Sequence, residues 1–329
     1  MVSIKDVARQ AGVAISTVSK VLNNYPNVSE ETREKVNRAV EELNFVPNSV
    51  AAALSSKHAG RVALLVNLNV EAQAIDEIDM RYISGALNKA MDLQLDVITL
   101  FFFMFKNKNV EEITRYLQSQ SITGIIIYGL SKEDIVIHEL IHSQKFKCVV
   151  IDGPIVNTNT SCVTIDHMKA QYEVALKTVD ENEYDKVLYI AGKKNGYVTD
   201  DRIEGMKRLA HDRGLSLKIE YGEFSELNAR NIVLEHGEKA NIIVCASDLM
   251  AIGAMKALQE MDIFRPVCGF DGIMLMAYVG KQMNTVYQNF SAISARAMEE
   301  LNGLMNGSEG RLVEMPYEIK QIKYLEILQ

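Results

Sequence analysis

Apolar side chains recur at helical spacing in three short stretches near the start of the chain. The stretches run over residues 4–11, 15–23 and 29–44. In each one, apolar residues lie three or four positions apart and polar residues fill the other faces, as in an amphipathic helix. The apolar sets expected to meet in a small core are Ile4, Val7, Ala8 and Ala11, then Val18, Val21 and Leu22, then Val36, Val40 and Leu43. We therefore predict a bundle of three short helices.

Local signals mark where these helices begin and end. Ser3 and Asp6 have the spacing of a capping box, and Gly12 allows a sharp turn before the second helix. Ser29 is placed to cap the third helix. Two short helices joined by a glycine turn, the second with a slim polar face, form a helix-turn-helix. The helix pattern alone is shared with generic three-helix bundles, so it leaves both interpretations open.

From Arg61 onward, continuous apolar runs alternate with helical patterns such as 110–118 and 201–213. The runs cover residues 61–66, 96–102, 123–129, 147–152, 186–192, 216–221, 241–247 and 265–270. The apolar segment Phe101–Phe105 is also interpreted as a buried strand. This alternation predicts doubly wound parallel sheets in two successive, similar subdomains. Ligands in such folds bind at the carboxyl ends of the strands, and the cleft between the subdomains is the expected place.

Length, charge and cysteine usage narrow the class of protein. The 329 residues suggest two or three domains, and the net charge of −8 confines any nucleic-acid binding to a local surface. The first 58 residues hold seven Lys and Arg against six Asp and Glu, or +1, which leaves −9 for the remainder. The four cysteines lack metal-ligand spacing and are interpreted as core thiols. With no signal peptide or membrane-spanning run, a cytoplasmic location is expected.

Two segments near the start carry a specific resemblance. SIKDVARQAGVAISTVSKVLNN and VSEETREKVNRAVEELNFVPNSVAAALSS closely resemble the headpiece of the LacI/GalR family of bacterial repressors. The resemblance implies an all-α helix-turn-helix headpiece (1–47), a hinge helix and linker (48–60), and a periplasmic-binding-protein-like α/β core. The core would comprise an N-subdomain (61–165 plus about 290–318) and a C-subdomain (166–289 plus about 319–329). It further implies a homodimeric repressor on a near-palindromic double-stranded DNA operator.

The resemblance also assigns DNA contacts to individual residues. Those placed to read bases in the major groove are Ile15, Ser16 and Lys20. Those placed against phosphates are Thr17, Ser19, Asn23, Ser29 and Thr32. Leu54, in the hinge helix 48–55, would enter the minor groove and kink the DNA. A helix of eight residues is marginal alone in water, so we expect it to form only when two hinges pack together on DNA.

Core segments extend the resemblance to an effector site. DRIEGMKRLA and SDLMAIGAMKAL match family helices that place Arg202 and Asp248 at the cleft, and GFDGI (269–273) and NTVYQNF (284–290) match further landmarks. Phe224 and Tyr197 are candidates to stack on a sugar ring, with ordinary packing as the alternative. The implied effector is a sugar or sugar phosphate, with no cofactor. The loops after the first core strand and before GFDG depart from the family, which leaves a phosphoprotein co-regulator as an alternative.

One motif suggests an enzyme instead. His138-Glu139-Leu140-Ile141-His142 has the H-E-x-x-H form of a zinc-dependent hydrolase, in which two histidines bind the metal and the glutamate acts as base. A catalytic zinc also needs a third protein ligand, and none follows at a recognisable spacing. We interpret the motif as a chance match on a crossover helix and expect neither metal nor catalysis. A periplasmic sugar-binding protein is disfavoured by the headpiece and by the lack of a signal peptide.

Overall fold

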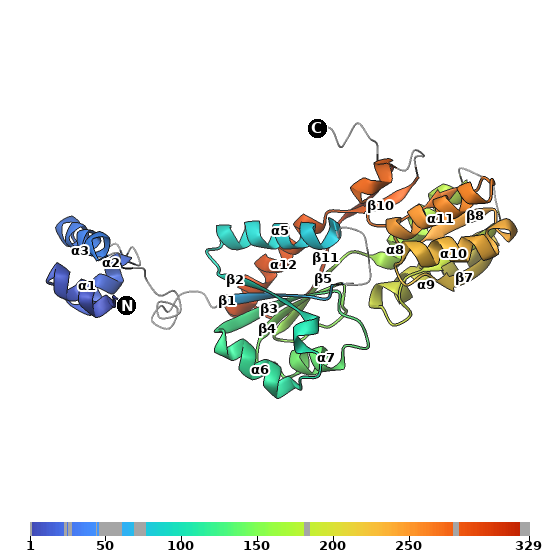
Figure 1. Cartoon of the computed structure of the whole chain (residues 1–329). Helices are drawn as coiled ribbons and strands as arrows, with labels where there is room; N and C mark the ends of the chain where they lie inside the picture. The colour runs from blue at the N-terminus through green and yellow to red at the C-terminus, as the bar shows by residue number, and fades with distance from the viewer. Residues whose placement is uncertain are drawn as a thin grey trace. The chain divides into compact units, whose positions relative to one another are not determined.

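The computed structural model describes residues 2–22, 25, 28–43, 45, 61–68, 77–180, 185–278 and 283–322. The chain divides into two compact units, Met1–His58 and Ala59–Gln329. We call them the headpiece and the core and describe each by itself (Figure 1). No helix in the described ranges is long and apolar enough to cross a membrane.

The headpiece contains the three predicted helices, α1 (Ile4–Ala11), α2 (Ile15–Leu22) and α3 (Glu30–Glu42). Their apolar faces meet in one cluster, whose buried members are Val7, Ala8, Val18, Val21, Val36, Ala39 and Phe45. The other predicted inward residues pack around this cluster and are half-buried. In α3 the most buried positions are Val36 and Ala39 rather than Val40 and Leu43. The apolar pattern therefore found the core with a shift of about one residue in α3.

The helix ends follow the predicted signals in part. Asp6 accepts hydrogen bonds from the backbone amide of Ser3 at 3.0 Å and from its hydroxyl at 2.7 Å. Gly12 ends α1 with a φ of +65°, a left-handed conformation that glycine adopts without strain. Ser29 precedes α3, but its hydroxyl lies 2.8 Å from the hydroxyl of Thr32 and makes no capping bond to the backbone.

The first sheet of the core has six parallel strands in the order β2-β1-β3-β4-β5-β11. They are β1 (Arg61–Val66), β2 (Val97–Phe101), β3 (Ile122–Tyr128), β4 (Lys147–Ile151), β5 (Thr160–Thr164) and β11 (Leu312–Glu314). Figure 1 shows α5 (Glu77–Asp92) and α12 (Phe290–Met305) on one face, and α6 (Val110–Ser119) and α7 (Ile135–His142) on the other. We call this sheet with its four helices the six-stranded lobe.

Apolar side chains cover both faces of this sheet. Along β1, Val62 and Leu64 belong to the apolar cluster under α5 and α12, whereas Ala63 and Leu65 belong to the cluster under α6 and α7. Alternate residues thus serve opposite layers, which is why the strand reads as a continuous apolar run. On β3, Gly124 lies directly under Leu301 of α12 and leaves space for that side chain.

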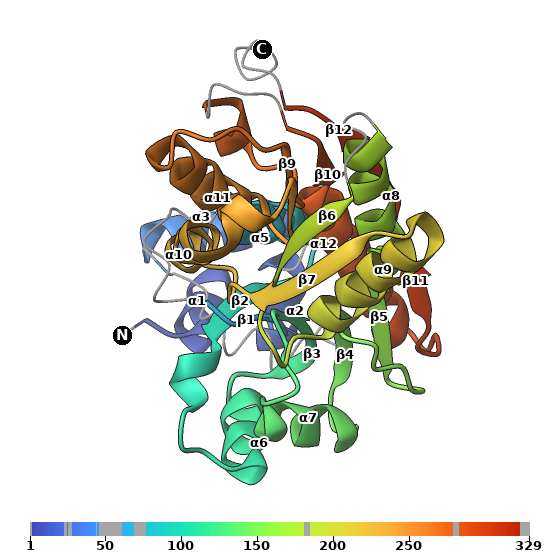
Figure 2. The same cartoon turned by 90° about the vertical axis from the view of Figure 1, so that its right-hand side faces the viewer.

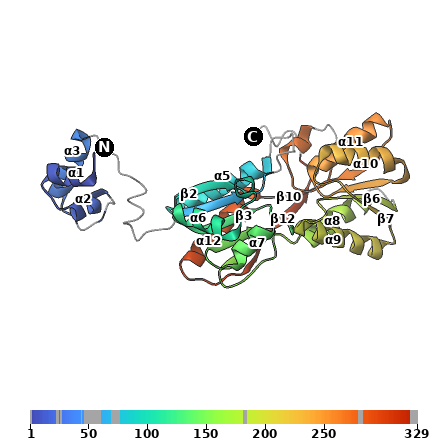
Figure 3. The same cartoon turned by 60° about the horizontal axis from the view of Figure 1, so that its bottom comes forward.

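The second sheet has four parallel strands in the order β7-β6-β8-β9. They are β6 (Lys186–Ala191), β7 (Ser216–Tyr221), β8 (Ile242–Cys245) and β9 (Val267–Cys268), with β7 at the edge (Figure 2). Helices α8 (His167–Asp180) and α9 (Tyr197–Arg213) cover one face, and α10 (Glu226–His236) and α11 (Asp248–Glu260) cover the other (Figure 3). We call this sheet with its four helices the four-stranded lobe.

Shorter elements complete the core. An antiparallel pair joins β10 (Thr285–Gln288) to β12 (Tyr317–Lys320). Three single 3₁₀ turns are η1 (Phe102–Phe105), η2 (Gly237–Lys239) and η3 (Met274–Tyr278).

The predicted doubly wound architecture is confirmed, and each of the eight predicted runs contains a parallel strand. The interpretation of Phe101–Phe105 as a buried strand is wrong beyond its first residue. β1 ends at Val66, which pairs with Phe101, so β2 loses its neighbour there and the chain turns into η1. Phe103 is 58% exposed. The four cysteines are buried thiols, as predicted.

Candidate functional site

In the headpiece, helix α2 has one face that is buried in the headpiece core and one that is exposed, which we call the outer face. Val18 and Val21 are buried in the headpiece core. The predicted base-reading residues lie on the outer face, where Ile15 is 44% exposed and Ser16 and Lys20 are exposed. An isoleucine that is open to solvent at the first turn of a short helix is available for contact with a partner. The helix therefore has the slim, accessible leading face that a major groove admits.

The predicted phosphate contacts are distributed around this face. Thr17, Ser19 and Thr32 are half-buried, and Ser29 is exposed. Asn23, Leu54 and the hinge 48–55 lie outside the described residues. The roles of all these positions toward DNA stay predictions.

In the core, a buried polar cluster forms around Arg202 of α9. Arg202 is 4% exposed, and its guanidinium carbon lies 3.6 Å from the ring centroid of Phe270. Its Nη1 donates to the carbonyl oxygen of Ala246 at 2.5 Å, and Nη2 and Nε lie 3.2 and 3.4 Å from Nδ1 of His167. The guanidinium is thus held by a stacked ring on one side and by acceptors from two other segments.

His167 connects Arg202 to a carboxylate. Because a guanidinium can only donate, Nδ1 of His167 must accept, and the ring proton therefore sits on Nε2. Nε2 lies 2.9 Å from Oδ1 of Asp152, the residue that follows β4. Burial alone would raise the pKa of Asp152, but the nearness of His167 and the hydrogen bonds from His167 and Thr164 outweigh it and lower the pKa. Asp152 is therefore a stable anion near Arg202.

A second carboxylate, Asp271, follows β9. Burial raises its pKa to about 7, helped by the charge of Asp152 and opposed by Arg202. Its Oδ1 accepts from Nε2 of Gln288 at 3.2 Å. Asp152 and Asp271 have φ values of +56° and +115°, which L-residues rarely adopt. Strained backbone of this kind concentrates at functional sites.

The cluster reaches into the six-stranded lobe. Tyr82 of α5 is buried, and its pKa is raised first by burial and then by the charges of Asp152 and Asp271. An aromatic hydroxyl from one lobe thus lies within electrostatic range of carboxylates that follow strands of both sheets. The members Asp152, Arg202 and Asp271 come from segments that follow β4, β6 and β9, at the carboxyl ends where ligands bind in parallel sheets.

Asp248, the other predicted effector residue, is fully buried and bonded to the protein itself. Its Oδ2 accepts from the backbone amides of Gly272 and Ile273 at 2.7 and 2.9 Å, and its Oδ1 accepts from the hydroxyl of Thr285 at 2.6 Å. These bonds tie the start of α11 to the loop after β9 and to β10. Contact between Asp248 and a ligand stays a prediction.

Phe224 and Tyr197, the proposed stacking residues, lie in different surroundings. The Phe224 ring lies against Gly192, where it leaves no room for a Cβ, and packs against the core cluster. Tyr197 packs against the apolar cluster under α6 and α7. Stacking of either ring on a ligand stays a prediction.

The H-E-x-x-H histidines are both engaged by protein groups. Nε2 of His138 lies 3.0 Å from the carbonyl oxygen of Ser131 and 3.4 Å from the hydroxyl of Tyr197. Nδ1 of His142 lies 2.7 Å from the carbonyl oxygen of His138. Within the described ranges, no three His, Cys, Asp or Glu side chains are grouped to hold a metal ion. These contacts support the interpretation of the motif as a chance match.

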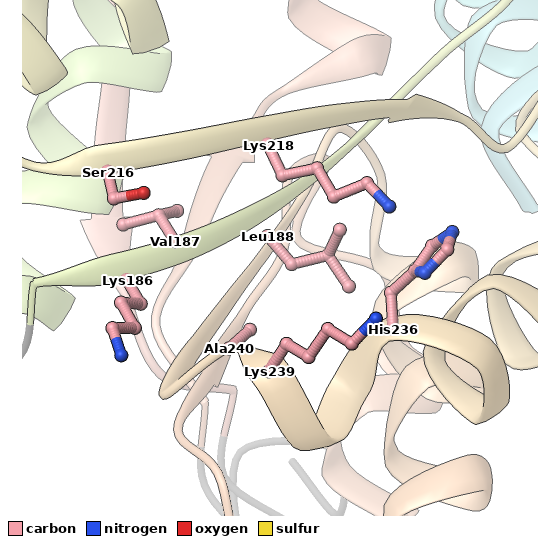
Figure 4. Close-up of a pocket in the computed structure, with 8 residues that line it drawn as sticks. All are labelled: Lys186, Val187, Leu188, Ser216, Lys218, His236, Lys239 and Ala240. Atoms are coloured by element: carbon pink, nitrogen blue, oxygen red, sulfur yellow. The ribbon is translucent and has the colours of Figure 1, made fainter.

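A separate cavity of about 190 Å³ lies near the amino ends of β6 and β7. It is lined by Lys186, Val187, Leu188, Ser216, Lys218, His236, Lys239 and Ala240 (Figure 4). Figure 4 shows the amines of Lys218 and Lys239 turned toward His236. Glu220 pairs with Lys218 at 3.2 Å and with His236 at 3.6 Å. The cavity is thus at the opposite strand ends from Arg202, and a carboxylate already neutralises part of its charge.

Sequence reasoning missed three members of the Arg202 cluster: Asp152, His167 and Asp271. Signals were present for two of them. Asp152 ends the predicted run 147–152, and Asp271 lies inside the landmark GFDGI. Polar residues directly after buried strands are candidates in any parallel sheet. His167 follows β5, which no apolar run predicted.

A helix-turn-helix headpiece before a two-sheet α/β core with a buried polar cluster at its strand ends defines a ligand-responsive DNA-binding regulator. Residues 3–48 match the family described as bacterial regulatory proteins, lacI family. Residues 80–279 match the periplasmic binding proteins and sugar binding domain of LacI family. The chain belongs to the LacI family and is a DNA-binding transcription regulator with a ligand-binding core.

Relatives align along nearly the whole chain. Catabolite control protein A of Priestia megaterium is 28% identical over 97% of this chain and 98% of its own. The transcriptional repressor PurR of Vibrio atlanticus is 29% identical over 97% of each chain. The fold is shared with the lac repressor dimer bound to operator and an anti-inducer, with a TM-score of 0.81, 21% identity and 98% of each chain covered. Two of these three proteins are named as repressors.

Proposed function

We propose that the protein is a repressor that binds a near-palindromic operator as a homodimer and is controlled by a small carbohydrate effector. The observation that carries the effector part is the buried group of Arg202, His167, Asp152 and Asp271 at the carboxyl ends of the strands. The exposed outer face of α2 supports the DNA part. Repression and dimeric DNA binding are further supported by the relatives, which include named repressors and a dimer bound to its operator.

We propose the following roles for residues of the headpiece. The bases would be read by Ile15, Ser16 and Lys20, and the phosphates would be bound by Thr17, Ser19, Asn23, Ser29 and Thr32.

Leu54 is proposed to enter the minor groove from the hinge helix. Leu54→Ser should lower affinity for the operator while leaving weak, salt-dependent binding to unrelated DNA, because the phosphate contacts remain. Fluorescence anisotropy on operator and random duplexes measures both. Equal operator affinity in wild type and variant would contradict the hinge proposal.

The chemistry of the cluster favours a neutral, hydroxyl-rich effector over a sugar phosphate. Arg202 already directs three of its five N–H groups to Ala246 and His167, which leaves two for a ligand. Asp152 is an anion that would repel a phosphate, and Asp271 offers a further acceptor oxygen. Oε1 of Gln288 is buried and has no hydrogen-bond partner within the described part of the chain, so it can accept a ligand hydroxyl. Hydroxyl groups both donate and accept, which suits this set.

A panel of neutral sugars and their phosphates tests this proposal through the midpoint of thermal unfolding. A ligand that binds only the folded state raises the midpoint with concentration. We expect a neutral sugar to do so, and Arg202→Ala to abolish the shift. A shift from phosphates alone would contradict the proposed chemistry. No shift with any sugar would favour the phosphoprotein co-regulator.

The homodimer is proposed to form through exposed apolar side chains of the core. On α5, Met80, Leu87 and Met91 are 61%, 40% and 76% exposed and follow one another at helical spacing. In η3, Met274 and Tyr278 are also largely exposed. Apolar patches of this kind mark interaction surfaces. A second copy of the chain is the occupant we propose.

We also propose how the core divides into subdomains, where the protein is located and that it is not an enzyme. The division of the core into 61–165 plus about 290–318 and 166–289 plus about 319–329 is supported by β11, which joins the six-stranded sheet after the chain has left the other lobe. A regulator must meet genomic DNA, which supports a cytoplasmic location. The relatives are regulators rather than enzymes, which supports the absence of catalysis.

A further inference from the structure

We propose that residues 131–138 and 195–200 form a latch between the two lobes of the core, and that this latch helps to set effector affinity without contacting the effector. The first segment lies between β3 and β4 and belongs to the six-stranded lobe. The second lies between β6 and β7 and belongs to the four-stranded lobe. The affinity part of the inference rests on the proposed effector binding, whereas the latch itself is a property of the free protein.

The latch has a backbone part. Ser131 and Gly196 form an antiparallel bridge, and the amide of Lys132 donates to the carbonyl oxygen of Asn195 at 3.0 Å. These bonds join segments 65 positions apart in sequence at the rim where the two lobes meet. They require the segments to lie side by side, so they exist only when this rim is closed.

Side chains surround the backbone bridge. Lys132 pairs with Asp200, and the side-chain amide of Asn195 donates to Glu133. The amine of Lys132 also lies 5.5 Å from the ring centroid of Tyr197. Each of these contacts joins a residue of one lobe to a residue of the other.

Tyr197 is the apolar part of the latch. It begins α9 of the four-stranded lobe, yet it packs against the apolar cluster under α6 and α7 of the six-stranded lobe. His138 meets it edge to face with ring centroids 6.0 Å apart, and the carbonyl oxygen of Ser131 holds the His138 ring in place. The first histidine of the H-E-x-x-H motif thus positions the tyrosine of the latch.

A second crossing contact lies at another point between the lobes. Glu77 of α5 accepts from the backbone amide of Met274, the first residue of η3, at 2.9 and 3.1 Å. Arg81 holds the same carboxylate at 2.6 Å. In the Arg202 cluster, Asp152 follows β4 of the six-stranded lobe and meets His167 and Arg202 of the four-stranded lobe, so the proposed effector site and both crossing contacts depend on how the two lobes meet.

The parts of the latch should contribute unequally. The side chains of Lys132 and Asp200 are 43% and 51% exposed, so losing this ion pair should shift the open-to-closed ratio only about two- to fivefold. Loss of the packed Tyr197 ring should shift it about tenfold or more. The apparent affinity for the effector is proportional to the fraction of the free protein that is already in the closed, binding-competent arrangement. A latch that raises this fraction therefore strengthens effector binding.

Distance measurements on the effector-free, full-length protein test the latch. The native cysteines are buried, so Glu139→Cys in α7 and Lys207→Cys in α9 accept spin labels selectively. Dilution with unlabelled protein isolates the distance within one protomer.

We expect Lys132→Ala combined with Tyr197→Ala to lengthen the distance between the two labels and to broaden its distribution. The control is Arg213→Ala, whose ion pair with Asp180 is 3.0 Å long and similarly exposed (44% and 47%) but lies within the four-stranded lobe. Identical distributions in wild type and latch variant would overturn the proposal.

A disulfide across the bridge supplies a second readout. Residues paired in an antiparallel bridge have Cα atoms about 4.5–5.5 Å apart, within the range of a disulfide. Ser131→Cys with Gly196→Cys is combined with Thr199→Ala, because a Cβ at Gly196 would otherwise lie 2.9 Å from the Thr199 hydroxyl. This protein should oxidise in the free state and restore the short distance to the latch variant. A folded double-cysteine protein that does not cross-link would contradict the closed rim. Both readouts omit the effector, so failure of every sugar to bind would contradict the proposed function and leave the latch result standing.

Discussion

At the residue scale, Asp248 shows how one buried carboxylate can hold in place the loop that carries a member of the Arg202 cluster. Its two oxygens accept three hydrogen bonds, from Gly272, Ile273 and Thr285. Gly269 also lies against it, with no room for a Cβ between them. The loop that carries Asp271 toward Arg202 is therefore anchored by a residue that the sequence resemblance had assigned to the ligand.

Asp248→Ala should destabilise the fold strongly. It leaves two amides and a hydroxyl unpaired in a dry interior, which costs on the order of 3 kcal/mol or more in the free energy of unfolding. Asp248→Asn keeps one acceptor oxygen and should cost less. Urea unfolding of the effector-free protein compares the two. If Asp248→Ala unfolds at the wild-type urea concentration, the structural role is refuted.

Asp271 should make stability depend on pH. Burial raises its pKa from the ordinary 3.8 to about 7, so the folded protein holds a proton that the unfolded chain has already released. The contribution of this group to stability is therefore present below about pH 4 and is lost as pH rises through about 7. Asp248 acts in the same direction and the lowered pKa of Asp152 in the opposite one, so a difference measurement is needed.

Asp271→Asn supplies that difference. From about pH 4 to about pH 7, the wild type should lose stability relative to this variant as the pH rises, as measured by urea unfolding at each pH. The loss arises because the unfolded carboxyl has released its proton while the buried carboxyl still holds it, whereas the asparagine amide titrates in neither state. A constant difference across the range would show that Asp271 does not titrate there.

At the element scale, apolar patterning found the strands with a continuous or alternating run of apolar residues, including β7 (SLKIEY), and missed the short or more polar strands. β5 reads TSCVT, and its Thr160 and Ser161 are fully buried. Ser161 can be buried because its hydroxyl accepts from the amide of Arg311, 150 positions away. Such a partner cannot be seen in local sequence. The Phe102–Phe105 turn was missed for a related reason, since the end of β1, and not the polarity of the segment, ends β2.

Helix α5 offers a test of packing against intrinsic propensity. A Cβ on Gly85 would overlap the carbonyl oxygen of Ser291 on α12. Gly85→Ala should therefore destabilise the protein, although alanine favours a helix by about 1 kcal/mol over glycine. Gly303→Ala in α12 is the control, because its Cβ would meet only the Ser308 side chain at 3.4 Å or more, and it should stabilise. Thermal unfolding compares them. Stabilisation by both substitutions would show that α5 and α12 are not tightly packed at Gly85.

The sequence predicted those residues of the candidate site that lie within a single recognisable motif. Arg202 could be named from its helix motif, but its partners His167 and Ala246 come from other segments and carry no motif. The exposed face of α2 followed directly from helical periodicity, since Val18 and Val21 fix which side is buried. Networks assembled from several segments depend on the tertiary fold, and that part was beyond pattern reasoning.

At the scale of the whole molecule, the proposed function combines two copies of the chain with a local charge contrast. The headpiece carries +1 and the remaining chain −9, from the counts of charged residues. A net negative core repels DNA, so binding should depend on the headpieces alone and weaken steeply with salt. Two linked headpieces bind far more tightly than one because the second contact is intramolecular.

Disrupting the proposed dimer surface should therefore weaken operator binding from a distance. Leu87→Glu with Met91→Glu places charges on the exposed stripe of α5 and should yield monomers by sedimentation velocity. Operator affinity should fall at least about tenfold. Leu312→Glu, on a leucine of β11 that is 58% exposed against 40% for Leu87, is the control and should stay dimeric. A dimer that persists in the α5 variant would contradict this surface.

The proposed function depends above all on sequence-specific DNA binding through the outer face of α2. The most direct test is a binding selection from genomic fragments at moderate salt, with wild type beside a variant carrying Ile15→Ala, Ser16→Ala and Lys20→Ala. The variant keeps the buried Val18 and Val21, so its headpiece should stay folded. We predict that the wild type enriches one near-palindromic site and the variant enriches none. The same site enriched by both proteins, or no site enriched by the wild type, would contradict the account.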